Sequence, residues 1–137
     1  MTAGGLETIA FEGAVLAYLA RGGSTPGETR FLTPAECNVQ VGHVVYPAGG
    51  EVLRHVHLPV VRHLVGTTEV LIVQRGRCEV DVYGPDPERR LVTTRQLCEG
   101  DILITLAGGH GFRMLEDTVL LEVKQGPYVA GGDKERF

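Results

Sequence analysis

Three histidines and one glutamate in the middle of the chain have the types and spacing of a metal site. His55 and His57 stand two residues apart in an extended, apolar stretch. Glu69 opens the next apolar run, and His110 follows in GDILITLAGGHGF. Residues i and i+2 of a strand point to the same face with Cα atoms roughly 6–7 Å apart, so both imidazoles can reach one ion. Three imidazoles and a carboxylate suit a divalent first-row metal, and we predict a mononuclear site.

Glu69 has three possible roles. It is in phase with Leu71 and Val73 on its apolar run, so its carboxylate shares their face of the strand. An unpaired carboxylate is unfavourable inside a protein, and a bound metal ion would remove that penalty. We therefore expect Glu69 to be a ligand. The alternatives are a base beside the metal, which would move a proton in catalysis, and a solvated charge at the start of a strand.

Polar residues near the histidine pair are candidates for binding a small-molecule ligand: His43, Tyr46, Arg54 and Arg62. The planar guanidinium of Arg54 or Arg62 matches a carboxylate or phosphate, although either can also be a solvated surface charge. Tyr46 can hydrogen-bond a ligand or cap the end of a barrel. His43 shares a face with neighbouring valines, which is more typical of a core or pocket-wall histidine than of a metal ligand.

Lys124 lies on the last long apolar run, TVLLEVKQ, where Glu122 and Lys124 alternate with Val119, Leu121 and Val123. If the valine face packs inward, the two charged residues form a solvent-exposed ladder, and this is the arrangement we expect. If they face the cavity instead, Lys124 can bind an anionic group or transfer a proton. Lys124 is therefore retained as a substrate-binding candidate.

Short runs rich in β-branched residues, separated by glycine and proline, predict an all-β protein. We expect strands at residues 38–46, 52–58, 68–75, 77–83, 90–97, 102–106 and 118–125. Residues 8–20 could form a short helix, but the β-rich remainder favours extended structure there. No βαβ alternation, linker or repeat is visible, so an antiparallel sandwich or barrel is the predicted architecture.

Composition excludes several classes of protein. The net charge of −4 and the low aromatic content of 6% disfavour binding to nucleic acid or to anionic membranes. No apolar run approaches the roughly 20 residues that a membrane span needs, and the N-terminus does not resemble a signal peptide. Cys37, Cys78 and Cys98 form no CxxC pair, which favours reduced, buried thiols. We expect a cytoplasmic protein with no membrane or nucleic-acid partner.

The histidine-rich region resembles the cupin superfamily of small β-barrels. The first cupin motif is written G(X)5HXH(X)3–4E(X)6G. Gly49, His55 and His57 match its start, while Glu69 and Gly76 match its end. The chain departs from the motif between these halves, because eleven residues separate His57 from Glu69. Extending a surface loop changes stability little, about 0.6 kcal/mol for each doubling of its length, so the same strand pairing is compatible with this insertion.

The second cupin motif, G(X)5PXG(X)2H(X)3N, is matched less completely. Gly100, Gly108 and His110 represent it, whereas Leu106 replaces the proline and Met114 stands where asparagine is usual. The resemblance covers about residues 40–125. The tail from GGHGF to KERF also resembles that of small stand-alone cupins encoded among surface-polysaccharide or sugar-modification genes.

The resemblance implies that residues 1–137 form a single cupin domain with a core of about 38–126, folded as a jelly-roll barrel (a double-stranded β-helix). It implies one divalent transition metal, Fe, Mn, Ni or Zn, held by His55, His57, Glu69 and His110. The expected function is enzymatic: isomerisation or epimerisation of a sugar derivative or another oxygenated metabolite. An iron-dependent dioxygenase and a non-catalytic metal- or sugar-binding module remain alternatives. Exposed edge strands favour pairing across a two-fold axis, so we expect a homodimer.

Overall fold

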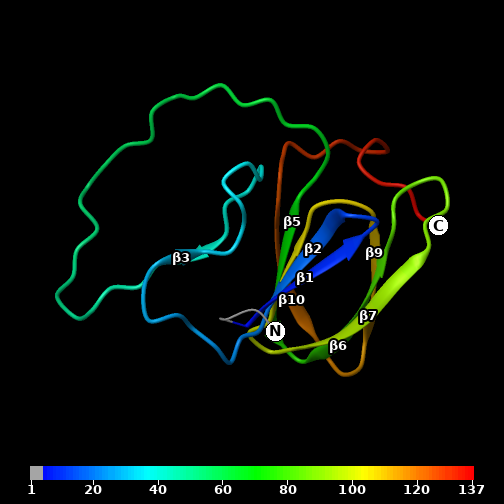
Figure 1. Cartoon of the computed structure of the whole chain (residues 1–137), viewed down its shortest axis with the longest axis horizontal. Helices are drawn as coiled ribbons and strands as arrows, with labels where there is room; N and C mark the ends of the chain where they lie inside the picture. Colours follow the sequence, from blue (N-terminus) through cyan, green and yellow to red (C-terminus); the bar gives the residue numbers. More distant parts are fainter. Residues whose placement is uncertain (1–4) are drawn as a thin grey trace. The chain divides into compact units, whose positions relative to one another are not determined.

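The computed structural model describes residues 5–137, which form two compact units. The larger unit joins the chain up to Ser24 with Thr67–Phe137, and the smaller unit is Thr25–Gly66. All regular structure in the described residues is β-strand, in ten strands (Figure 1). The predicted all-β class is therefore confirmed. Whether the chain folds as a single domain stays a prediction.

The larger unit contains two antiparallel sheets. The five-stranded sheet has the order β1 (Leu6–Phe11), β2 (Ala14–Ala20), β8 (Ile102–Thr105), β5 (Glu69–Arg75) and β10 (Val119–Lys124). The three-stranded sheet has the order β7 (Leu91–Cys98), β6 (Arg77–Tyr83) and β9 (Gly109–Met114). Both sheets are open: β1 and β10 are the edges of the first, and β7 and β9 are the edges of the second. Neither sheet closes into a barrel within residues 5–137.

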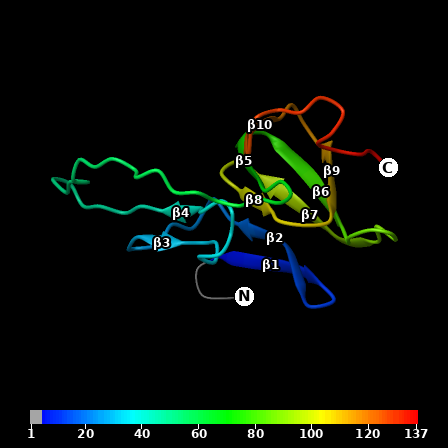
Figure 2. The same ribbon diagram turned by 90° about the horizontal axis from the view of Figure 1, so that it is seen from above.

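The two sheets pack face to face over one apolar core (Figure 2). Strand alternation creates it, because every second side chain points to the same face. On β6, Cys78, Val80 and Val82 are buried, while the residues between them are partly exposed. The buried cluster draws on both sheets and consists of Ile9, Leu16, Ala17, Leu19, Leu71, Val73, Cys78, Val80, Val82, Leu97 and Leu103.

Gly76 connects the two sheets, since it is the one residue between β5 and β6. Its φ of +89° lies in the left-handed region that favours glycine. A Cβ at this position would stand 2.3 Å from the carbonyl oxygen of Asp117. The predicted break between the strands 68–75 and 77–83 therefore falls at Gly76, where the chain passes directly from one layer to the other.

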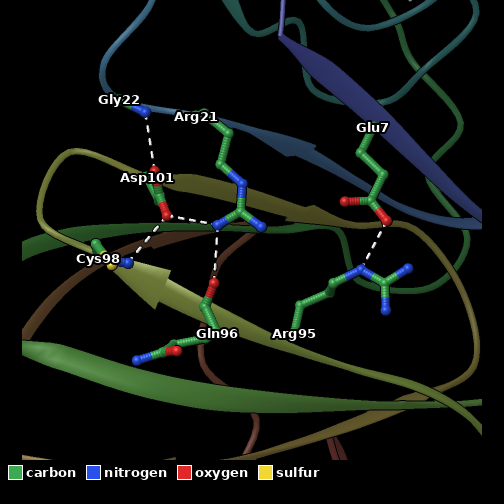
Figure 3. A network of polar contacts seen from close by, with 7 residues as sticks. All are labelled: Glu7, Arg21, Gly22, Arg95, Gln96, Cys98 and Asp101. Atoms are coloured by element: carbon green, nitrogen blue, oxygen red, sulfur yellow. Dashed lines mark hydrogen bonds and ion pairs between the residues drawn. The ribbon is translucent and has the colours of Figure 1, made fainter. Parts of the chain in front are cut away.

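One end of the sandwich is held by a buried carboxylate, Asp101, which is 5% exposed (Figure 3). Asp101 accepts hydrogen bonds from the backbone nitrogens of Gly22 and Cys98, both at 2.9 Å. It also pairs with Arg21 at 2.8 Å, and the same guanidinium nitrogen donates to the carbonyl of Gln96 at 2.8 Å. These contacts tie the end of β2 to the turn between β7 and β8.

An ion pair joins the sheets at one flank of the sandwich. Arg95 on β7 donates to Glu7 on β1 at 2.7 Å, so the two edge strands of this flank are linked (Figure 3). Arg95 is the cross-strand partner of buried Val80, which places it on the inner face at the edge of the core. The opposite flank runs between β9 and β10, and it carries the candidate site.

The smaller unit contains little regular structure. Its strands β3 (Arg30–Phe31) and β4 (Gly42–His43) pair with each other, and residues 44–66 form no strand. The prediction of a strand at 52–58 is therefore wrong for this structure. Of the strand predicted at 38–46, only β4 forms. The apolar side chains of 52–58 find no neighbouring strand in this unit and stay exposed, from 60% at Val52 to 82% at Val56.

Candidate functional site

The two inner faces of the larger unit meet at Glu69 and His110. Glu69 begins β5 in phase with buried Leu71 and Val73, as the sequence predicted. His110 lies on β9 opposite buried Val82, so its ring also points between the sheets. Its Nε2 stands 2.7 Å from Oε2 of Glu69. The structure thus brings together two of the four predicted metal ligands.

This contact controls the charge of Glu69. The pKa of the carboxyl falls to about 2, chiefly because His110 hydrogen-bonds to the carboxylate, while partial burial opposes the change. A hydrogen bond with Glu122 and the charge of Lys124 lower the pKa of Glu69 further. Glu69 is therefore a carboxylate at neutral pH, the form in which it can bind a metal ion or accept a proton.

The last strand, β10, forms a wall beside this pair. Lys124 is the cross-strand partner of Glu69, and Leu120 is the partner of Val73. Leu120, Glu122 and Lys124 therefore share the inner face, and Leu120 packs against the core. Both charged residues are still reached by solvent, because this flank of the sandwich is open.

The expectation that Glu122 and Lys124 are exposed is confirmed, but the expectation that the valine face of this strand packs inward is wrong. Val119, Leu121 and Val123 are 39%, 43% and 50% exposed, and Leu120 is the residue that joins the core. A register irregularity between Val119 and Leu120 fixes which set faces the core. A shift of one residue exchanges the two faces of a strand, and both faces of β10 contain apolar side chains, so alternation alone could not decide.

Glu122 is a site residue that the sequence reasoning did not propose. Its pKa is raised, first by the hydrogen bond with Glu69 and then by partial burial and by the negative charge of Glu69. Two carboxyl groups this close resist simultaneous ionisation. Glu122 could have been predicted from its two-residue spacing from Lys124, because two such residues share a face of the strand and an inward Lys124 implies an inward Glu122.

His55 and His57 belong to the smaller unit, where both side chains are exposed. Their rings make an edge-to-face contact with centroids 5.2 Å apart. Nδ1 of His55 lies 2.8 Å from the carbonyl oxygen of Leu53. Because a carbonyl only accepts, this nitrogen must donate, which leaves the lone pair of the neutral ring on Nε2. A metal-bound histidine commonly has this arrangement, with one nitrogen donating to a carbonyl.

The remaining candidates for substrate binding also lie in the smaller unit. Tyr46, Arg54 and Arg62 are exposed, and Tyr46 is 52% exposed. His43 ends β4, and its Nδ1 is buried with no hydrogen-bond partner among the described residues. The roles of these four residues in binding stay predictions.

Within residues 5–137, no three histidine, cysteine, aspartate or glutamate side chains gather into a group that could hold a metal ion. The predicted ligands instead form two pairs, Glu69 with His110 in one unit and His55 with His57 in the other. The donor types in each pair fit a divalent transition metal. The four-ligand site therefore stays a prediction.

The three cysteines are free thiols, as predicted, but only Cys78 is buried. Burial raises the pKa of the Cys78 thiol, which makes it a poor nucleophile. Cys98 is exposed and Cys37 is half-buried. Cys98 pairs in register with Arg77, so Cys78 and Cys98 occupy opposite faces of the sheet.

Comparison with known proteins adds no assignment. No family model matches the chain, and neither the curated proteins nor the solved structures give a match. Over the described part of the chain, no helix has both the length and the apolar character required to cross a membrane.

Proposed function

We propose that the chain is a metal-binding cupin in which His55, His57, Glu69 and His110 hold one divalent transition ion. The observation that carries the proposal is the Glu69–His110 contact of 2.7 Å on the inner face of the open flank. It brings together an oxygen donor and a nitrogen donor, and the oxygen donor is a carboxylate as metal binding requires, because the pKa of Glu69 is about 2. The pair needs two more donors.

The other two donors in this proposal are His55 and His57. Both side chains are exposed in the smaller unit, and their rings lie together with centroids 5.2 Å apart. Nδ1 of His55 donates to the carbonyl of Leu53, so Nε2 of that ring carries the lone pair that can bind an ion.

The long insertion between the motif halves allows this arrangement. Eleven residues separate His57 from Glu69, and an extended chain of that length spans up to about 36 Å. The loop is therefore long enough for the four residues to belong to one site, as the cupin resemblance implies. The fold that we propose for that state is the jelly-roll barrel of the cupins.

The reaction class we propose is isomerisation or epimerisation of a sugar derivative or a similar oxygenated metabolite. A divalent ion, when bound, would polarise a carbonyl or hydroxyl oxygen of the substrate. Glu69 and Glu122 share a hydrogen bond beside that position, so the carboxyl pair can take up or return a proton. The closed core behind Leu71 and Val73 keeps bulk water away from one side of the site.

Metal analysis of protein purified without chelator tests the proposal. The wild type is expected to carry one ion per chain. His57→Ala is expected to lower metal occupancy at least about tenfold, since removal of a ligand acts directly on affinity. His63→Ala is the matched control, because His63 lies exposed in the same strandless stretch, residues 44–66, and is not a proposed ligand. Circular dichroism checks that each variant keeps its strands.

Absence of stoichiometric metal in the wild type would contradict the proposal, and equal losses in both variants would remove His57 from the site. With metal present, isomerase assays on sugar derivatives and oxygen-uptake assays separate the proposed reaction from a dioxygenase. Ligand binding without turnover would instead identify a non-catalytic binding module.

A further inference from the structure

We infer that the metal-loaded site binds a small hydroxylated molecule that carries an anionic group, with Lys124 pairing the anion and Glu122 hydrogen-bonding a hydroxyl. The inference rests on the proposed metal site and names the substrate class of that site. It follows from the orientation of β10. We expected the valine face of this strand to pack inward, but Glu122 and Lys124 lie on the inner face instead.

Lys124 is placed to meet a ligand at the open flank. It stands in register opposite Glu69, on the inner face that Leu120 shares. Its side chain is exposed, so a ligand can reach the ammonium group. None of the ion pairs among the described residues includes Lys124. By contrast Arg95, the inward cation at the opposite flank, is paired with Glu7.

The balance of charge in the loaded site favours an anion. A divalent ion and Lys124 bring three positive charges, and neutral histidines add none. Glu69 and Glu122, both ionised, bring two negative charges, so at least one positive charge remains. Charges in a partly buried site are stable when they are paired, and a bound anion would complete the pairing. A neutral sugar would leave this net positive charge of the loaded site unbalanced.

Glu122 supplies the second part of the recognition. Glu122 lies with Lys124 on the inner face of β10, in register opposite Leu71, and so stands at the edge of the site. Once Glu69 ligates an ion, Glu122 can turn to a ligand hydroxyl, and it offers a hydrogen bond in either protonation state. Recognition of an anion and a hydroxyl together describes a polyhydroxylated acid or a sugar phosphate. Carboxylate and phosphate share the chemistry that Lys124 would recognise.

Binding of three six-carbon probes to metal-loaded protein tests the inference by calorimetry. The probes are sorbitol, gluconate and sorbitol 6-phosphate, which are neutral, a carboxylate and a phosphate. We expect at least one anion to bind about tenfold more tightly than sorbitol, and the better anion identifies the group. Lys124→Met is expected to abolish this preference, and Lys124→Arg to keep it. Glu122→Ala is expected to weaken all three probes while the preference for the anion persists.

Arg90→Met is the charge control, because Arg90 is exposed and pairs with Glu88 in the turn between β6 and β7. Metal content is measured on every sample. Either of two results would overturn this inference alone. One is an unchanged preference for the anion in metal-loaded Lys124→Met, and the other is a loss of that preference in Arg90→Met as large as in Lys124→Met. Unchanged binding by Glu122→Ala would overturn the role of Glu122. A wild type that takes up no metal would overturn the proposed function and this inference with it.

Discussion

His110 donates a hydrogen bond from Nε2 to Oε2 of Glu69 across 2.7 Å, and this contact joins the two sheets at the flank between β9 and β10. The opposite flank is joined by Arg95 and Glu7, also at 2.7 Å. Among the described residues, a polar side-chain contact therefore links the two sheets on each side of the sandwich. Only the first is flanked by a second carboxyl and a lysine, and this is why we place the chemistry there.

The first prediction concerns pH. The pKa of Glu69 in the folded protein is about 2, below its ordinary value of 4.5, so its interactions stabilise the fold above pH 4.5. That stability is lost as pH falls from about 4.5 towards 2, where the folded carboxyl takes up its proton. Glu69→Gln is expected to lower the free energy of unfolding at pH 7 by about 1–3 kcal/mol. The difference from wild type should shrink over that pH range.

Urea unfolding at a series of pH values measures this effect. Glu79→Gln is the control, because Glu79 pairs with Arg113 on the outer face at 3.4 Å, where solvent screens the pair. A difference between Glu69→Gln and wild type that stays constant from pH 7 to pH 2.5 would show that the Glu69–His110 contact does not set the pKa of Glu69.

The second prediction ranks the two polar contacts in Figure 3. Asp101→Ala is expected to lower the free energy of unfolding by about 3 kcal/mol, since it leaves buried backbone donors without partners. Arg95→Ala removes a half-exposed ion pair and should have a smaller effect, about 0.5–1 kcal/mol. Denaturant unfolding of both variants checks the order, and a reversed order would mean that Asp101 does not hold the β7–β8 turn.

The third prediction concerns residues 52–58. If His55 and His57 ligate the ion, metal binding should slow amide hydrogen exchange in this segment, because ligation would hold its backbone in place. Hydrogen exchange followed by mass spectrometry, with and without a chelator, measures the change. The paired strands β6 and β7 serve as an internal reference that should not respond. Fast exchange in 52–58 with metal bound would contradict ligation by His55 and His57.

The strands of the larger unit were largely predictable from sequence. Alternation and turn residues located β5, β6, β7, β8 and β10 to within one or two residues at each end. The hairpin of β1 and β2 was expected only as extended chain. β9 was missed because GHGFRM contains two glycines and little β-propensity, and it becomes a strand through pairing with β6. Tertiary pairing decides such segments.

The candidate site was predictable in its residue types more than in its arrangement. Glu69 was placed correctly on the inner face because Leu71 and Val73 set the phase of β5. The inward position of Glu122 could not be foreseen, since it depends on the register between β10 and β5. For residues 52–58, local propensity predicted a strand, but a strand needs a neighbour, and sequence alone does not provide one.

The fourth prediction is that the chain forms a homodimer. Among the described residues, the edge strand β7 pairs on one side only, and a two-fold axis that pairs it with its copy would cover that edge. Light scattering at micromolar concentration measures the mass. A single monomeric species at that concentration would contradict this expectation, and the proposal of a metal site would not be affected.

X-ray absorption spectroscopy of the metal-loaded protein tests the central claim most directly. With zinc as the probe ion, we predict imidazole nitrogens and one carboxylate oxygen at about 2.0–2.2 Å, with the scattering of three imidazole rings. His110→Ala should lose one ring, and His55→Ala should lose another. A bound ion surrounded only by oxygen, or a spectrum that neither substitution alters, would contradict the site formed by His55, His57, Glu69 and His110.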